Sequence, residues 1–143
     1  MIRSPLAGPM QLKADADTTG GRFTLLENEV PPKAGPPLHR HHSEDEMYYV
    51  LKGTFRFKLA DRIELAPAGA FVYIPKGTPH CFQNVGDEAA RFLVMFTPAG
   101  MERFFKRTAD LPPGPMDSDA HLAVARDCAM EILGPPLAVS DPL

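Results

Sequence analysis

Prolines and glycines break this chain so often that most of it cannot form long helices. The 143 residues include 16 prolines and 11 glycines, and proline interrupts helices and central strands because it lacks a backbone N–H donor. Turn signals recur roughly every eight to twelve residues. The runs between them are short and rich in aromatic and β-branched side chains. This pattern predicts an all-β sandwich or barrel.

The expected strands follow one another along the first two thirds of the chain. In the stretch TFRFKL, Phe55 and Phe57 alternate with polar residues, so both face the same side of a sheet. We expect strands at residues 10–13, 22–30, 38–42, 47–51, 54–59, 63–65, 71–74, 80–84 and 90–97.

Two later segments, residues 100–109 and 118–129, have helical character instead. Met101 and Phe105 stand one helical turn apart in the first segment, and Ser118 is an N-cap candidate for the second.

One domain is expected for a chain of this length. We expect a β-barrel with an N-terminal arm over residues 1–98, and a helical tail over residues 99–143 that packs on the outside of the barrel.

Charge and hydropathy exclude several classes of function. The net charge is -3 and no block of five basic residues occurs, so binding to nucleic-acid phosphates is disfavoured. No stretch approaches the ~18 apolar residues of a membrane span, and the first residues do not form a signal peptide. We therefore expect a soluble, cytoplasmic protein without a nucleic-acid or membrane partner. Its two cysteines, Cys81 and Cys128, are expected to be free thiols in apolar settings.

Three of the five histidines stand together in the stretch LHRHHSEDEMYYVL. On a strand, alternate side chains share a face, so His39 and His41 point one way while Arg40 and His42 point the other. Two imidazoles on one face can reach a common metal ion. The pair is equally compatible with two exposed loop histidines, and the spacing alone does not decide.

Three acidic residues, Glu44, Asp45 and Glu46, follow the histidines. Glu44 and Asp45 read best as a solvated acidic turn. Glu46 begins the next strand and shares a face with Tyr48, so it enters the same space as the histidines if that face is the barrel interior. Imidazole and carboxylate ligands suit Fe, Mn, Ni, Co or Zn.

A fourth histidine, His80, follows the tight turn PKGTP, where proline and glycine fix the direction of the next residue. Taken alone, a histidine at a strand start is more often structural than a ligand. His121 lies in the second expected helix, outside any cluster, and we expect it on the surface.

The two clusters together resemble the two motifs of the cupin superfamily. The second family motif, G-x5-P-x-G-x2-H-x3-N, is matched in full by Gly69, Pro75, Gly77, His80 and Asn84.

The first family motif, G-x5-H-x-H-x3,4-E-x6-G, is matched by His39, His41, Glu46 and Gly53. Its spacing selects Glu46 over the two neighbouring carboxylates. The opening glycine of the motif falls on Lys33, which departs from the family pattern but removes no ligand.

The resemblance covers residues 22–97 and implies a double-stranded β-helix, the jelly-roll cupin barrel. It implies a divalent transition metal ion (Fe, Mn, Ni, Co, Cu or Zn) held by His39, His41, Glu46 and His80. It also implies a homodimer formed through sheet edges. The tail is similar to that of small single-domain bacterial cupins of the quercetin dioxygenase type.

We expect a metal-dependent oxygenase of the dioxygenase type that acts on a small, largely apolar enol, phenol or diketone. Glu46 is the expected catalytic residue, because a carboxylate released from the metal can accept a proton. Tyr48 is the expected polar contact in the substrate pocket, although ordinary core packing would explain it equally well. Two alternatives stay open: a non-redox isomerase, decarboxylase or lyase, and a module that binds a small ligand without catalysis.

The wall of the substrate pocket is expected to be apolar, with alternate residues of each strand facing inward. The candidates are Phe55, Phe57, Phe71, Tyr73, Phe82, Phe92, Met95 and Phe96.

Overall fold

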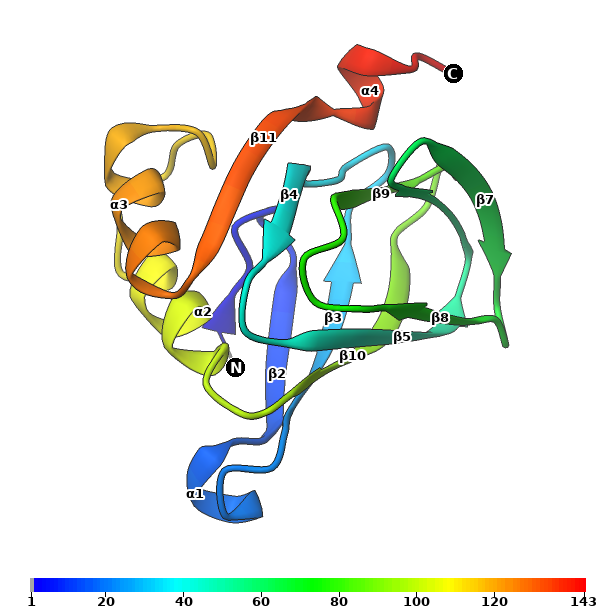
Figure 1. Ribbon diagram of the computed structural model, residues 1–143. Coiled ribbons are helices and arrows are strands. Elements are labelled where there is room, and N and C mark those ends of the chain that lie inside the picture. The colour runs from blue at the N-terminus through cyan, green and yellow to red at the C-terminus, as the bar shows by residue number, and fades with distance from the viewer. Residues whose placement is uncertain (1) are drawn as a thin grey trace.

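Two antiparallel sheets face each other in the computed structural model, which describes residues 2–143 (Figure 1). One sheet has the strand order β1-β2-β3-β10-β5-β8 and the other β11-β4-β9-β6-β7. The strands of the first sheet are β1 (Ile2–Arg3), β2 (Pro9–Ala14), β3 (Thr24–Val30), β10 (Ala90–Thr97), β5 (Asp45–Lys52) and β8 (Phe71–Ile74). Those of the second are β11 (Met130–Pro136), β4 (Pro37–His41), β9 (His80–Asn84), β6 (Thr54–Leu59) and β7 (Arg62–Pro67). The helices are α1 (Ala16–Thr19), α2 (Glu102–Ala109), α3 (Asp119–Asp127) and α4 (Leu137–Ser140).

The expected all-β double-stranded β-helix is therefore confirmed, and each expected strand lies within about two residues of its place. Alternation determines which side chains fill the space between the sheets. Along β10, every second residue from Ala90 to Phe96 is buried, and the same period holds along β3. These inward positions form one continuous apolar core.

Five of the eight pocket-wall candidates face this core, namely Phe55, Phe57, Phe82, Phe92 and Phe96. Phe71 and Tyr73 on β8 point outward and are exposed to 62% and 50%. Their outward direction follows from the register, which places Val72 and Ile74 of the same strand inside.

Strand β11 was not expected, because the sequence of the tail suggested only helices. Its residues Met130 and Ile132 pair with His41 and His39 of β4. The sequence GPP inside it is unusual for a strand, but β11 is the edge of its sheet, and an edge strand tolerates proline. The tail therefore extends the barrel wall as well as covering it.

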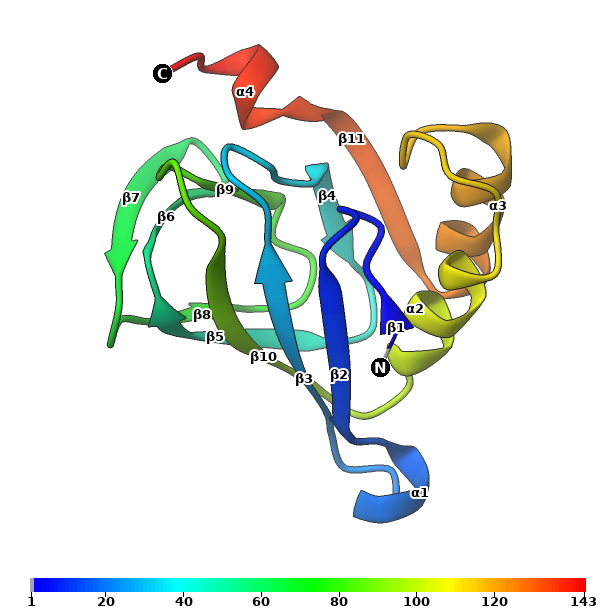
Figure 2. The same cartoon turned by 180° about the vertical axis from the view of Figure 1, so that it is seen from behind.

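Helices α2 and α3 lie together on the outside of the barrel, beside β1 and β11 (Figure 2). Phe104 of α2 is buried against the core. His121 of α3 is also buried, with 5% exposure, so its expected place on the surface was wrong. Its Nδ1 lies 2.9 Å from Oγ of the N-cap residue Ser118, and this partner allows the imidazole to face inward. No helix in residues 2–143 is long and apolar enough to cross a membrane.

Lys33, which replaces the first glycine of the family motif, keeps a glycine-like backbone with φ of 64°. Its Nζ donates to the carbonyl of Val85 at 2.6 Å, so the side chain ties this loop to the next one. Close packing of the loop occurs two residues later. A Cβ on Gly35 would lie 1.9 Å from the carbonyl oxygen of Phe82.

Candidate metal centre

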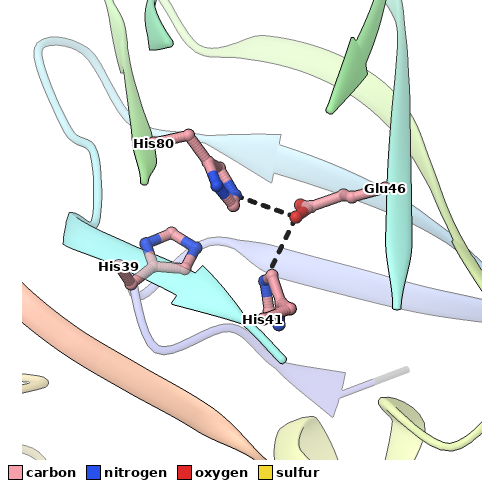
Figure 3. Close-up of side chains that lie close together, drawn as sticks. All are labelled: His39, His41, Glu46 and His80. Atoms are coloured by element: carbon pink, nitrogen blue, oxygen red, sulfur yellow. Dashed lines mark hydrogen bonds and ion pairs between the residues drawn. The ribbon is translucent and has the colours of Figure 1, made fainter. Parts of the chain in front are cut away.

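Four side chains from three strands meet in the barrel interior (Figure 3). His39 and His41 come from β4, Glu46 from β5, and His80 from the first position of β9. All four are buried, with exposures of 1–4%, and one ligand atom of each lies within 4.8 Å of the others. The structure thus brings together the four residues that the motifs selected.

The carboxylate of Glu46 lies between two of the imidazoles. Its Oε2 is 3.1 Å from Nε2 of His41 and 2.9 Å from Nε2 of His80. Ligands at about 2.1 Å from a metal ion in adjacent octahedral positions are about 3 Å apart. The spacing of these three atoms therefore fits neighbouring ligands on one ion.

Backbone carbonyls orient two of the imidazoles. Nδ1 of His39 lies 2.7 Å from the carbonyl of Pro37, and Nδ1 of His80 lies 2.9 Å from the carbonyl of Thr78. A proton on each Nδ1 donates to its carbonyl and leaves Nε2 free as a metal ligand, which is the usual outer support of a metal-binding histidine.

His41 has a side-chain neighbour in place of a backbone carbonyl. Its Nδ1 lies 3.9 Å from Oε1 of Glu44, and both atoms are buried without a hydrogen-bond partner. Glu44 is 7% exposed, so its expected place in a solvated turn was wrong. Burial raises the pKa of this carboxyl, although the nearby His41 acts in the opposite direction.

Burial and mutual charge determine the protonation of the cluster. Burial acts to raise the pKa of Glu46, but ion pairing with His80 and His41 outweighs it and holds this pKa well below its ordinary value. Burial, together with charge on His80 and His41, lowers the pKa of His39 well below its usual value. The centre therefore offers an ionised carboxylate and at least one neutral imidazole, which are the forms that bind metals.

The second motif turn is fastened to the first motif. Gly77, with φ of 83° in this turn, donates its N–H to the carbonyl of His41 at 2.7 Å. Oδ1 of Asp45 accepts a hydrogen bond from the backbone N–H of Lys76 at 2.9 Å. Asp45 is thus a structural link between the motifs. This link holds His80 in register with the two histidines of β4.

Arg40 of β4 and His42, which directly follows this strand, point away from the centre, as alternation predicts. The guanidinium of Arg40 and Nε2 of His42 lie 2.8 Å and 3.1 Å from Oε1 of Glu131 on β11. These two residues link β4 to β11 on the outer face of the barrel and do not contribute to the metal centre.

Tyr48 stands beside the centre on the same face as Glu46. Its hydroxyl donates to Oε1 of Glu46, and its ring stacks on Phe92 with centroids 4.8 Å apart. Burial, together with the charge of Glu46, raises the pKa of this phenol well above its usual value, so the phenol keeps its proton. The expected contact of Tyr48 with substrate stays a prediction.

An apolar cavity adjoins three of the four candidate ligands, His39, His41 and Glu46. Among residues 2–143, no lysine or arginine contributes to its wall. His39, His41 and Glu46 line it together with Tyr48, and the other lining side chains come from the N-terminal arm, the core and the tail. These are Ser4, Pro5, Leu6, Asn28, Pro36, Phe82, Phe92, Val94, Phe96, Met101, Phe104, Phe105, Met116 and Met130.

Two residues near the centre were missed by reasoning from the sequence, Glu44 and Asn28. Asn28 is a polar residue at an inward position of β3, between the fully buried Leu26 and Val30. Its even spacing from these two apolar residues was the available signal. Glu44 gave no such signal, because it stands in an acidic run that reads as a solvated turn.

The donor set fits a divalent transition metal. Three imidazoles and one carboxylate are borderline to hard ligands, which suit Fe, Mn, Co, Ni, Cu or Zn better than they suit a soft Cu(I) ion. A buried carboxylate among three buried imidazoles is costly unless its charge is compensated, and a bound cation supplies that compensation. The residues present therefore fit the metal site that the motifs imply.

Comparison with known proteins identifies the same domain. The cupin domain family matches residues 27–96. The chain is 32% identical over 74 residues to the uncharacterised protein MJ1618 of Methanocaldococcus jannaschii, covering 52% of this chain and 59% of that protein. It is 34% identical over 74 residues to mannose-1-phosphate guanylyltransferase 2 of Escherichia coli O157:H7, which is 52% of this chain and 15% of that enzyme. The match thus spans less than two thirds of either relative.

A solved structure shares the fold. The crystal structure of a predicted oxalate decarboxylase of Thermotoga maritima superposes with a TM-score of 0.60 at 23% identity, over 62% of this chain and 78% of that one. The family match, the two-sheet barrel and the ligand cluster agree, and residues 27–96 of the chain form a cupin domain.

Proposed function

We propose that this cupin is a metal-dependent oxygenase of the dioxygenase type that acts on a small, largely apolar enol, phenol or diketone. The observation that carries the proposal is the pairing of four buried N and O ligands with an apolar cavity that no lysine or arginine lines in the described chain. An apolar wall favours a neutral or weakly acidic molecule with an apolar body, and the ligand cluster would bind the oxygen atom of that molecule.

The absence of lysine and arginine from the cavity wall, within the described residues, bears on which substrates the site can bind. Several similar structures carry the name oxalate decarboxylase or oxalate oxidase, and one relative is named a mannose-1-phosphate guanylyltransferase. A small dianion or a sugar phosphate needs cationic partners inside its site, because an unpaired charge is costly in an apolar cavity. Oxalate and sugar phosphates are therefore disfavoured here.

A bound Fe, Mn, Co, Ni or Cu ion would polarise a substrate oxygen and supply redox chemistry with O₂. His39, His41, Glu46 and His80 would hold it. The apolar wall excludes water from the bound substrate, which strengthens the electrostatic interactions of the site.

Glu46 is the proposed base of the reaction. Its carboxylate is ionised among the imidazoles of the metal-free cluster and would stay ionised beside a bound cation, and it faces the cavity. The hydroxyl of Tyr48 donates to Oε1, which orients the carboxylate and leaves Oε2 directed at His41 and His80. An oxygen of Glu46 that accepts the acidic proton of an enol or phenol would form the electron-rich anion that reacts with O₂.

The test combines metal analysis with O₂ uptake. The purified protein, reloaded separately with Fe(II), Mn(II), Co(II), Ni(II), Cu(II) and Zn(II), is screened for O₂ consumption with catechols, flavonols and β-diketones. We expect uptake with at least one redox-active ion, no uptake with Zn(II), and loss of uptake in Glu46→Gln. Turnover with Zn(II) and without O₂ would favour a non-redox isomerase or lyase. Ligand binding without turnover for any of the ions would favour a binding module.

A further inference from the structure

We propose that Asn28 is the second polar anchor of the substrate, so that the natural substrate is a neutral molecule with a hydroxyl or carbonyl group in addition to its metal-binding oxygen. This inference rests on the proposed metal-dependent function and specifies the substrate class of the same cavity. It concerns a residue that lies outside both sequence motifs.

The carboxamide oxygen of Asn28 lacks a partner in a place where partners are normally obligatory. Asn28 is 6% exposed, and its Oδ1 is buried without a hydrogen bond. Buried side-chain oxygens are nearly always paired, and the exceptions call for an explanation. Asn28 also lines the cavity that contains His39, His41 and Glu46, so its side chain borders the space where a ligand would bind.

The surroundings of Asn28 would suit an apolar residue. It stands between Leu26 and Val30 on the inward face of β3, and its cross-strand partners are Met10 and Phe92. A leucine there would continue the core with no polar group to satisfy. An asparagine in such a place weakens packing unless something outside the protein pairs with it.

The other polar side chains of the cavity, apart from the metal ligands, already have partners in the protein. Oγ of Ser4 accepts from the N–H of Leu6 at 3.1 Å, and the hydroxyl of Tyr48 donates to Glu46. Among residues 2–143, Asn28 is thus the polar side chain of the cavity wall, apart from the metal-binding residues, that has an atom without a partner. It is therefore available to pair with a bound substrate. A carboxamide has both donor and acceptor atoms, so it can pair with either a hydroxyl or a carbonyl.

Asn84 provides a matched control within the same barrel. It is also buried, with 1% exposure, but its Nδ2 donates to the carbonyls of Val30, Pro31 and Glu88, and its Oδ1 accepts from the N–H of Gly86. Asn84 is therefore a structural amide, whereas Asn28 is an unpaired one. The same replacement by leucine should destabilise the protein at Asn84 but not at Asn28.

The first experiment compares melting temperatures of the metal-free protein. We expect Asn28→Leu to melt at or above the temperature of the wild type, and Asn84→Leu to melt well below it. A melting temperature of Asn28→Leu below that of the wild type would overturn the inference, because Asn28 would then be a structural residue.

The second experiment measures binding of catechol probes to the Ni(II)-loaded protein under nitrogen. Catechol and 4-methylcatechol are compared with pyrogallol and 4-(hydroxymethyl)catechol, each of which adds one hydroxyl. We expect at least one added hydroxyl to tighten binding to the wild type by about 5- to 10-fold, and Asn28→Leu to remove this gain while its nickel content stays unchanged.

The outcomes separate this inference from the proposed function. If no probe gains from its hydroxyl, or if the gain persists in Asn28→Leu, the role of Asn28 is refuted whatever the wild type turns over. If the gain appears and depends on Asn28 but no substrate consumes O₂, the oxygenase proposal fails and the anchor remains.

Discussion

Oε1 of Glu44 lies 3.9 Å from Nδ1 of His41, and neither atom has a hydrogen-bond partner. The other two histidines of the centre rest on backbone carbonyls at 2.7 and 2.9 Å. Glu44 thus takes the place at His41 that the backbone carbonyls have at the other two histidines. A small rotation of either side chain would bring the two atoms within hydrogen-bond distance. Carboxylates that orient a metal-binding histidine typically affect metal affinity by about 10- to 100-fold.

We therefore expect Glu44→Ala to weaken metal binding by roughly 10- to 100-fold while the barrel stays folded. Competition with a chelator, followed by metal analysis, measures the affinity. Glu88→Ala serves as the control, because Glu88 is acidic but exposed. Equal affinities for wild type and Glu44→Ala would show that His41 needs no partner.

His41→Ala should abolish tight metal binding, because it removes one of four buried ligands. It should also remove the stabilisation that added metal gives to the wild type, since an ion that binds only the folded state raises its stability. His42→Ala is the matched control, for its imidazole contacts Glu131 on the outer face. Thermal melts with and without metal measure both variants. Stoichiometric metal in purified His41→Ala would refute the assignment of this ligand.

Gly35→Ala should destabilise the protein strongly. The added Cβ would lie 1.9 Å from the carbonyl oxygen of Phe82, and a backbone atom cannot move aside as a side chain can. Overpacking of this kind costs about 1–3 kcal/mol or more. Gly114→Ala is the control, since its nearest atom would be 3.9 Å away. Denaturant unfolding of the metal-free proteins gives both values, and a neutral Gly35→Ala would mean that this loop has room to shift.

Glu102 should make the stability depend on pH. Burial acts to raise its pKa, but hydrogen bonds from Thr24 and from backbone N–H groups, including those of Ala16 and Gly100, lower it below the ordinary value of 4.5. A lowered folded-state pKa means that the ionised form stabilises the fold above about pH 4.5, and that this contribution disappears as pH falls through the folded-state pKa.

Glu102→Gln should therefore cost about 1–3 kcal/mol at neutral pH, and the difference from the wild type should shrink on acidification. Denaturant unfolding of both proteins between pH 3 and pH 7 measures it. A difference that stays constant over this range would show that ionisation of Glu102 does not contribute.

The sequence predicted the barrel well because alternation and turn residues are local signals. The positions of Phe55 and Phe57, and the opposite directions of His41 and His42, all follow from period two on a strand. The four candidate ligands could be selected because the motif spacings relate segments that are distant in sequence. The motif spacing, and not the chemistry of any single histidine, identified His80 as a partner of the two histidines on β4.

Long-range packing explains what the sequence did not show. His121 is buried because its helix turns that face toward the protein. Met130 to Pro136 form a strand because β4 offers them an open edge, which overrides the local signal of glycine and proline. The burial of Glu44 likewise depends on its tertiary surroundings.

Because β11 lies near the end of the chain, the strand that aligns two of the metal ligands is synthesised late. β4 carries two of the four ligands, yet its pairing with β9 is limited to His39 and His80, while its pairing with β11 extends from His41 to Pro37. Residues 130–136 leave the ribosome long after the motifs that hold the ligands. A newly made chain therefore contains every metal-binding side chain before it has the strand that aligns two of them, so stable capture of the ion is expected near the end of synthesis of these residues.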